Sequence, residues 1–221
     1  MKQDFNHEAV EASTVHMIQN GIYHLQAHRF AENEMLHSGR LLRWAEPKPG
    51  SHIVDLGSGI GAQAAAWMEM RPDLKFTLVN LNSFQLDMSP SGCRTILCNM
   101  ENVPVSSSKF DMALACFSIG HCDLENVMYE ASRLLKPDGI FFVYDMVASK
   151  GQSDALHSIA YEIHDRNTLE FEAAKAGLIL DFYMEPSDSG EIKSKVPEIG
   201  QLFAGLQPAI WRFIKDDNEY L

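Results

Sequence analysis

The sequence has no long apolar segment and no leader-like start. None of its apolar runs approaches the roughly 20 residues that a membrane-spanning helix needs. The first residues, Met1 to Asp4, contain no apolar signal region. We therefore expect a soluble, cytoplasmic protein with no membrane span.

Basic residues are also scarce. The 221 residues include 18 Lys and Arg against 30 Asp and Glu, a formal net charge of -12, and the basic residues are scattered. Because nucleic-acid binding depends on neutralising phosphates with a basic surface, this balance argues against DNA or RNA as the main partner. We expect a small-molecule ligand, and the sequence leaves a homo-oligomer open.

Cysteines with a recognisable spacing are absent. The four cysteines, Cys93, Cys98, Cys116 and Cys122, form neither a C-x-x-C motif nor the framework of a secreted domain. Reduced, buried thiols are the expected state. A structural zinc ion would need further ligands, for which His121 beside Cys122 is the only candidate, so we predict no metal site.

What the sequence does have is an alternation of strand-like apolar runs with helical patterns. Between residues 50 and 147 this alternation predicts an α/β fold with a parallel sheet, whose ligand lies at the carboxyl ends of the strands. Strands are expected from residue 52 and over 75–81, 94–98, 110–116, 140–144, 178–184 and 209–214. Helices are expected over 22–44, 63–70, 84–88, 124–135, 153–163 and 168–175, with a turn at 136–139 and a capping box from Asn167 to Glu170.

The length fits one domain, 1–221. Within it, residues 1–49 are expected to form a helical cap and residues 50–147 a ligand-binding core. Residues 148–221 should supply substrate-side helices and the last strands.

The most informative stretch follows the first strand. The apolar run His52 to Leu56 carries one acid, Asp55, and leads into glycines at 57, 59 and 61. Three glycines allow a tight turn and a close approach to a ligand, and the helix after them can direct free N–H groups at it. The spacing also fits the dinucleotide fingerprint, so the loop alone leaves two ligand classes open.

An acid is missing where a dinucleotide-binding enzyme is expected to carry one. About twenty residues after the loop, at the end of the second predicted strand, the sequence has Asn80. Asp55, two residues before the first glycine, is instead placed to meet an ammonium group, which S-adenosylmethionine has and a pyrophosphate lacks. This favours S-adenosylmethionine, with a nicotinamide-dependent dehydrogenase as the less favoured alternative.

Four motifs in order make residues 50–147 resemble the Rossmann-like, class I S-adenosylmethionine-dependent methyltransferase superfamily. Segments 54–61, 98–104, 110–115 and 132–139 are similar to its glycine loop, adenine-side segment, fourth strand and helix-turn-strand signature. The resemblance implies a doubly wound, mostly parallel, seven-stranded sheet with an N-terminal helical cap. The sequence departs from the family at Asn80 and Asn99, where acids facing the ribose and the adenine are usual.

Other details resemble the C-methyltransferases that act on prenyl diphosphates and related terpenoid alkenes. They are Cys98 to Met100, Asn80 to Asn82 near Gln85, and Ile163 to Arg166. The resemblance implies C-methylation of an isoprenoid. For a diphosphate substrate, Arg166 and Arg29 are the available anion partners, with Mg²⁺ as an added cofactor. The Glu that this subfamily usually carries after its fourth strand is replaced here by Phe117.

The resemblance and the strand ends together assign the site. Cofactor-binding residues are expected at Tyr23, Asp55, Gly57, Ser58, Gly59, Gly61, Asn80, Leu81, Gln85, Asn99, Met100, Glu101 and Cys116. His121 is the candidate base, and Phe117 and Tyr161 are candidate aromatic walls for a cation. His164 is expected to share one helical face with His157 and Tyr161, as part of the substrate wall.

Two classes of function follow. The favoured one is a small-molecule methyltransferase that methylates an isoprenoid or terpenoid carbon, with O- or N-methylation of another metabolite as the runner-up. The other is a cofactor-binding subunit that does not methylate, which the departures at Asn80, Asn99 and Phe117 suggest.

Overall fold

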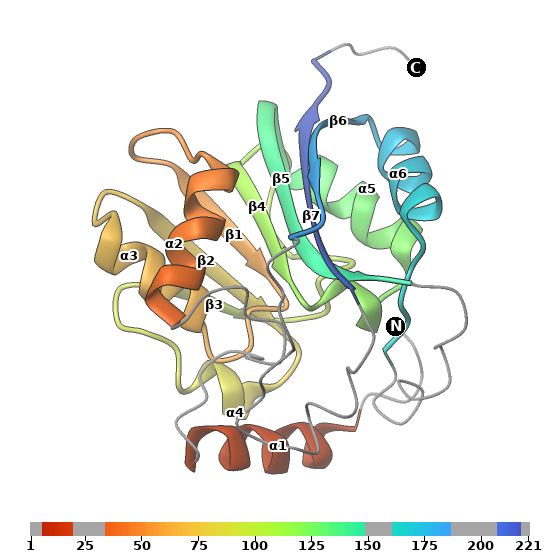
Figure 1. The fold of residues 1–221 in the computed structure, drawn as a ribbon. Helices are drawn as coiled ribbons and strands as arrows, with labels where there is room; N and C mark the ends of the chain where they lie inside the picture. Colours follow the sequence, from red (N-terminus) through yellow and green to blue (C-terminus); the bar gives the residue numbers. More distant parts are fainter. Residues whose placement is uncertain (1–5, 20–33, 149–160, 187–206, 218–221) are drawn as a thin grey trace.

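The computed structural model describes residues 6–19, 34–148, 161–186 and 207–217. They form one seven-stranded sheet with the strand order β3-β2-β1-β4-β5-β7-β6 (Figure 1). The strands are β1 (His52–Leu56), β2 (Lys75–Asn80), β3 (Arg94–Leu97), β4 (Phe110–Cys116), β5 (Leu135–Val147), β6 (Leu178–Met184) and β7 (Gln207–Lys215). β1 to β5 run parallel, and β7 pairs antiparallel with β5 and β6. The predicted Rossmann-like, mostly parallel sheet is confirmed.

Helices cover both faces of this sheet. α2 (Glu34–Ala45) and α3 (Ala62–Met70) pack together on one face, and α5 (Leu124–Leu134) and α6 (Arg166–Lys175) on the other (Figure 1). Two short helices, α4 (Ser83–Leu86) and the 3₁₀-helix η2 (Ile119–His121), follow β2 and β4. The carboxyl ends of the central strands stay clear of these layers.

Alternating side chains separate two apolar cores. On β1, Ile53 packs with Trp67 of α3, whereas Val54 and Leu56 pack in the cluster that contains α5. The Trp67 indole N–H also donates to the Ser38 carbonyl at 3.0 Å, which ties α3 to α2. Because the sheet is packed on both faces, the loops at the carboxyl ends of its strands are held on a rigid support.

The N-terminal helices do not act as one cap. α1 (His7–Gln19) lies beneath the carboxyl ends of the strands, next to α4 (Figure 1). α2 instead belongs to the helical layer on the sheet, where Leu41 and Ala45 are fully buried. Of the helix expected over 22–44, the stretch 20–33 lies outside the described residues. Among the described elements, the cap over the strand ends is therefore α1.

The turn expected at 136–139 is an irregularity inside β5. The pairing of β4 with β5 jumps from Phe110 opposite Leu135 to Met112 opposite Ile140. Asp138 has a φ of 57° there, in the left-handed region that turns use. The turn signal was therefore real, but the strand begins before it because Leu135 already pairs with β4.

The capping box expected from Asn167 to Glu170 is wrong. The N-cap of α6 is Asp165, whose carboxylate accepts from the backbone N–H groups of Asn167 and Thr168 at 3.0 and 3.2 Å. A short acidic side chain just before the first turn satisfies these donors directly. Residues 161–165 are not helical, so the helix expected over 153–163 does not reach its predicted end, and its earlier part lies outside the described residues.

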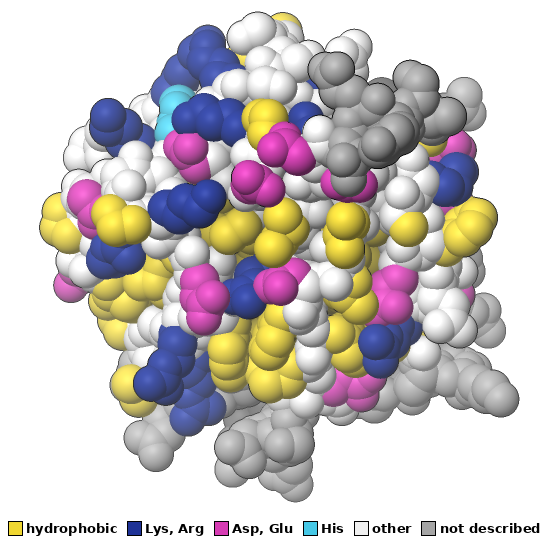
Figure 2. Space-filling model, turned by 90° about the horizontal axis from the view of Figure 1, so that it is seen from above, with side chains coloured by type: hydrophobic (Ala, Val, Ile, Leu, Met, Phe, Trp, Pro, Cys, Tyr) yellow, Lys and Arg dark blue, Asp and Glu magenta, His cyan; other side chains and the backbone are white. Residues whose placement is uncertain are grey.

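The face above the amino ends of the parallel strands carries charges of both signs. Figure 2 shows Lys and Arg side chains interspersed with Asp and Glu around a hydrophobic band. This pattern differs from the continuous basic footprint of a nucleic-acid site. Within the described ranges, no helix is long and apolar enough to cross a membrane.

Candidate active site at the carboxyl ends of the strands

The glycine loop after β1 lies where the strand order reverses, between β1 and β4. Gly57 has a φ of 77°, and a Cβ there would come within 2.4 Å of the Ser118 Cβ, so only glycine fits. Gly59 also has a positive φ, 55°, but a Cβ there would meet nothing within 4 Å. The loop is thus closed against its neighbour at one glycine and open at the next, as a ligand-binding turn at a switch point requires.

Buried polar atoms surround the open side of this loop. Ser58 Oγ and Gln63 Nε2 are buried and have no hydrogen-bond partner among the described residues. α3 begins after Gly61, which provides no side-chain cap. Because buried polar groups are normally paired, these groups fit the polar tail of a ligand. Gln63 was not predicted, although its place in the first turn of α3 is the signal that points to it.

Asp55 is a buried carboxyl group beside the loop. It is 2 % exposed, and burial raises its pKa to about 7 without an opposing effect from a described neighbour. A cationic group placed next to it would favour the ionised form. The site therefore suits a ligand that carries an ammonium group.

Asn80, at the end of β2, is held by a chain of amide contacts that reaches α1. Asn80 Nδ2 donates to Gln85 Oε1 at 2.8 Å, and Gln85 Nε2 donates to Thr14 Oγ1 at 2.8 Å. Asn82 caps α4 by accepting from Gln85 N at 3.0 Å, and its amide donates to Glu11 at 3.2 Å. With its nitrogen engaged, Asn80 offers its oxygen as an acceptor, which is what a ribose hydroxyl requires.

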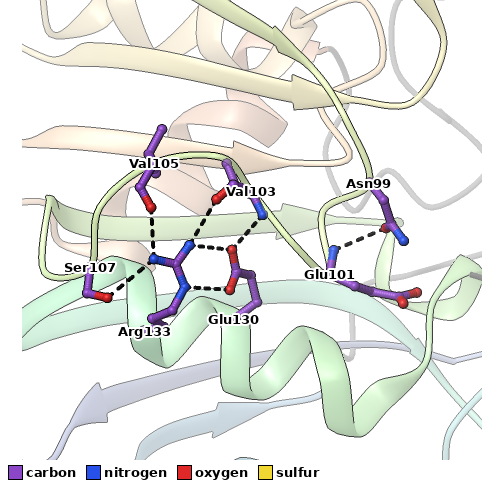
Figure 3. A network of polar contacts seen from close by, with 7 residues as sticks. All are labelled: Asn99, Glu101, Val103, Val105, Ser107, Glu130 and Arg133. Atoms are coloured by element: carbon purple, nitrogen blue, oxygen red, sulfur yellow. Dashed lines mark hydrogen bonds and ion pairs between the residues drawn. The ribbon is translucent and has the colours of Figure 1, made fainter.

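The predicted adenine-side segment follows β3 (Figure 3). Asn99 Oδ1 accepts from Glu101 N at 3.1 Å, and Glu101 Oε1 accepts from Asp123 N at 3.1 Å. Met100 between them is buried against the glycine loop, with its sulfur 3.3 Å from where a Cβ of Gly57 would lie. This segment and the glycine loop therefore form one surface.

An ion pair on α5 supports the chain just beyond this segment (Figure 3). Arg133 Nη2 lies 2.6 Å from Glu130 Oε1, and the same carboxylate oxygen accepts from Val103 N at 2.6 Å. The Arg133 guanidinium donates to the carbonyls of Val103 and Val105 at 3.0 and 2.8 Å and to the Ser107 hydroxyl at 3.3 Å. The Glu130 carboxylate and the Arg133 guanidinium therefore both bind the backbone of residues 103–105 and hold this segment in place.

Phe117, directly after β4, has a strained backbone. Its φ of 51° is rare for a bulky residue, and its N–H donates to the Tyr144 carbonyl at 2.9 Å. The two rings meet edge to face with centroids 4.6 Å apart. The next side chain, Ser118, donates to the Leu56 carbonyl at 2.7 Å and so joins this loop to the glycine loop. Strain of this kind concentrates at functional sites.

His121 and Tyr161 form a second aromatic pair next to it. Their centroids are 4.8 Å apart and the rings are nearly perpendicular. Tyr161 packs on Gly120, where an added Cβ would lie 2.5 Å from the ring, and Glu162 N donates to the Gly120 carbonyl at 2.8 Å. The structure thus brings the predicted His121 and Tyr161 together, whereas the predicted Phe117 pairs with Tyr144.

The shared helical face expected for Tyr161 and His164 is wrong, because the segment 161–165 is not helical. His164 is 9 % exposed, and its carbonyl accepts from Ala148 N at 3.3 Å, so it lies against the end of β5. His157 lies outside the described residues.

Asp145 is a site residue that sequence reasoning missed. It is 2 % exposed near the carboxyl end of β5 and accepts from the Tyr161 hydroxyl, from Met146 N at 2.7 Å and from Ile119 N at 3.3 Å. Burial raises its pKa to about 6. An acid directly after the predicted strand 140–144 was the available signal.

The remaining predicted residues fall into three groups. Leu81 and Cys116 are half-buried at the ends of β2 and β4. Tyr23 and Arg29 lie outside the described residues. Arg166 is engaged elsewhere, since its Nε donates to Glu170 at 2.6 Å and its guanidinium stacks 3.7 Å from the Tyr183 ring centroid.

The sheet order and the glycine loop at the switch point match the Rossmann-like methyltransferase fold. Residues 54–143 match the family model described as "Methyltransferase domain". Among curated proteins, the chain is 28% identical over 185 residues to "Sterol methyltransferase-like 1" of Botryococcus braunii. The aligned stretch covers 75% of this chain and 47% of that protein. The chain spans between 34% and 47% of the length of the first curated relatives.

Solved structures agree on the fold. A geranyl diphosphate C-methyltransferase from Streptomyces coelicolor A3(2), in complex with Mg²⁺, geranyl diphosphate and S-adenosyl-L-homocysteine, is similar with a TM-score of 0.73 at 18% identity, over 82% of this chain and 77% of that one. The [4+2]-cyclase SpnF is similar with a TM-score of 0.77 at 15% identity, over 96% of this chain and 94% of that one. Proteins of different activity thus share this architecture.

Proposed function

We propose that the chain binds S-adenosylmethionine at the carboxyl ends of β1 to β4 and methylates a carbon atom of an isoprenoid or terpenoid. The observation that carries the proposal is the buried Asp55 carboxyl beside the open Gly59, at the switch point of a methyltransferase domain. When bound, the cofactor supplies an electrophilic methyl group. The chain's own residues hold and orient the two reactants.

The residues present fit this cofactor. Asp55 would take the ammonium group, and the unpaired Ser58 and Gln63 groups would take the polar end of the same tail. Asn80 would accept from a ribose hydroxyl, and Met100 would pack on the adenine side. Among the described residues, the Ser58 hydroxyl and the Gln63 amide nitrogen have no hydrogen-bond partner that a ligand would have to replace.

An uncharged alkene is the favoured acceptor. Methyl transfer to a neutral carbon moves the positive charge onto the acceptor, and a dry aromatic face steadies such a charge by roughly 0.5 to 2 kcal/mol. We assign this role to the rings of Phe117 and Tyr161, each of which packs edge to face against another aromatic ring. A diphosphate acceptor is less favoured because Arg166, one of its two candidate partners, is already paired with Glu170. A Mg²⁺ requirement would accompany only the diphosphate.

Two alternatives are kept for specific reasons. O- or N-methylation is favoured if His121, half-buried after β4, removes a proton from the acceptor. A protein that binds the cofactor without methylating is favoured by the strained Phe117 and by the amides at 80 and 99, which replace the usual acids.

Binding and turnover separate these functions. Calorimetric titration should show binding of S-adenosylmethionine and S-adenosylhomocysteine and no heat with NAD⁺. Labelled S-adenosylmethionine should then be offered with linear and cyclic terpenoid alkenes, prenyl diphosphates with and without Mg²⁺, phenols and amines. We expect label in the alkenes. Label only in phenols or amines would support the runner-up, and binding without S-adenosylhomocysteine formation would support the non-methylating protein.

A further inference from the structure

Asp145 joins three segments of the chain through one carboxylate. Its donors include Met146 N on its own strand, Ile119 N on the loop after β4, and the Tyr161 hydroxyl on the segment 161–165. The last two segments also bind each other, because Glu162 N donates to the Gly120 carbonyl at 2.8 Å. Asp145 is therefore the polar centre of the acceptor side of the site.

Tyr161 carries this connection to His121. Its ring lies edge to face against His121 and presses on Gly120, the residue before it. A buried phenol keeps its hydroxyl where it finds a partner, and Asp145 is that partner. Without the carboxylate, Tyr161 would lose its anchor, and the His121 ring would lose the surface that orients it.

We propose that Asp145 is a positioning residue for methyl transfer, whose ionised carboxylate fixes Tyr161 and the loop 118–121 and, through them, the ring of His121. This rests on the function proposed above. The ionised form matters because a carboxylate only accepts hydrogen bonds, as each of these donors requires. A protonated carboxyl would present a donor to one of these groups and loosen the arrangement.

The ionisable side chains whose pKa values Asp145 influences come from three segments of the chain. Cys116 comes from β4, Tyr144 from β5 and Tyr161 from the segment 161–165, and burial raises the pKa of all three well above its usual value, so they stay neutral near pH 6. Burial raises the pKa of Asp145 to about 6, and the Tyr161 hydroxyl and the backbone N–H groups pull it down from a still higher value. Removing the hydroxyl should therefore raise this pKa further.

The test is a pH profile of kcat for the full chain with its best acceptor. The wild type should lose activity below an apparent pKa near 6. Tyr161→Phe should move this acid limb to higher pH, and Asp145→Asn should lower kcat by about 100-fold and abolish the limb, as expected when a reacting geometry shifts by about 1 Å. The matched control is Asp111→Asn, because Asp111 also accepts from a backbone N–H and a side chain but lies at the amino end of β4.

A second measurement does not depend on activity. In the cofactor-free protein, the aspartate side-chain carboxyl signals observed by carbon NMR should include one with a pKa near 6 that is absent in Asp145→Asn and shifted upward in Tyr161→Phe. If kcat and the acid limb of both variants match the wild type, the positioning role is overturned. If no acceptor is turned over but the NMR titration behaves as described, the proposed function has failed, while the contact between Asp145 and Tyr161 is supported. An unshifted carboxyl signal in Tyr161→Phe would overturn that contact.

Discussion

At the scale of single residues, the site is defined by groups whose environment is incomplete without a ligand. Asp55 is the clearest case, because burial alone raises its pKa to about 7. A neighbouring positive charge would reverse that effect. If Asp55 holds the ammonium group of the cofactor, as proposed above, cofactor binding and the ionisation of Asp55 are coupled.

Cofactor affinity should weaken as the pH falls below about 7. Below that pH the free protein holds Asp55 neutral, so binding a ligand ammonium must first release a proton. Titrating S-adenosylhomocysteine between pH 5.5 and 8.5 in buffers of different ionisation enthalpy should show this proton release. Asp55→Asn should bind more weakly at pH 8 by about tenfold or more, equivalent to at least one charged hydrogen bond, and should show no proton release. Equal proton release from both proteins would exclude Asp55 as the coupled group.

Some of these residues could be predicted and others could not. Asp55 and Gly57 follow from spacing alone, since an acid two residues before a glycine turn has a fixed place at the strand end. Asp145 could have been found by the same rule applied to the strand over 140–144. The contact of Gln85 with Thr14 joins residues 71 positions apart, and no local pattern encodes it.

At the scale of elements, α1 is attached to the cofactor side by a few polar contacts. Thr14 is 1 % exposed and receives the Gln85 amide, which in turn holds Asn80. A cofactor that fixes Asn80 should therefore also fix α1, and the affinity should depend on this helix.

Thr14→Val should weaken cofactor binding by about fivefold, because it removes the buried hydrogen bond from Gln85, worth about 1 kcal/mol, while keeping the side-chain shape. It also removes the bond from the Thr14 hydroxyl to the Val10 carbonyl, which lies within α1. Hydrogen exchange of residues 7–19 should slow on adding S-adenosylhomocysteine to the wild type, and less so in the variant. Thr14→Ser keeps the hydroxyl, and Ser13→Ala alters an exposed neighbour, so both should resemble the wild type. A wild-type Kd for Thr14→Val would show that α1 is not coupled to the site.

Element boundaries were predicted well where a turn residue and pairing agree, and poorly where pairing extends past a turn. β2 and β4 match their expected ranges to within a residue at either end. β5 starts five residues early because Leu135 pairs with Phe110 before the turn at 136–139. Pairing between strands is a tertiary interaction, so a single-chain pattern cannot supply it.

At the scale of the whole molecule, two buried acids make stability depend on pH in an unusual direction. Asp55 and Asp145 have folded-state pKa values of about 7 and 6, above the ordinary value of 3.8. The folded protein therefore holds protons that the unfolded chain has already lost between about pH 4 and 7. The stabilisation from these two groups is present at low pH and is lost as the pH rises through 6 to 7.

The free energy of unfolding of the cofactor-free protein should accordingly be greater at pH 5.5 than at pH 7.5, by a few kcal/mol. Denaturant unfolding at a series of pH values measures this. Asp55→Asn should lose most of the difference, whereas Asp111→Asn should keep it. Burial raises the pKa of the Asp111 carboxyl, but Lys136 and the His52 N–H together lower it by more, so its pKa lies below the ordinary value. A wild type that is less stable at pH 5.5 would contradict the burial of these acids.

The hydrogen bond from the Ser118 hydroxyl to the Leu56 carbonyl has a consequence for how this protein can change. This hydrogen bond connects the loop 117–121, which would contact the acceptor, to the loop 56–61, which would contact the cofactor. The two loops are in close contact, because a Cβ on Gly57 would lie 2.4 Å from the Ser118 Cβ. A substitution that reshapes 118–121 for a new acceptor therefore also disturbs the nucleoside end. We infer that the set of accepted substrates changes most readily through substitutions in segments that do not take part in this hydrogen bond. Substitutions in 117–121 require matching changes in 56–61.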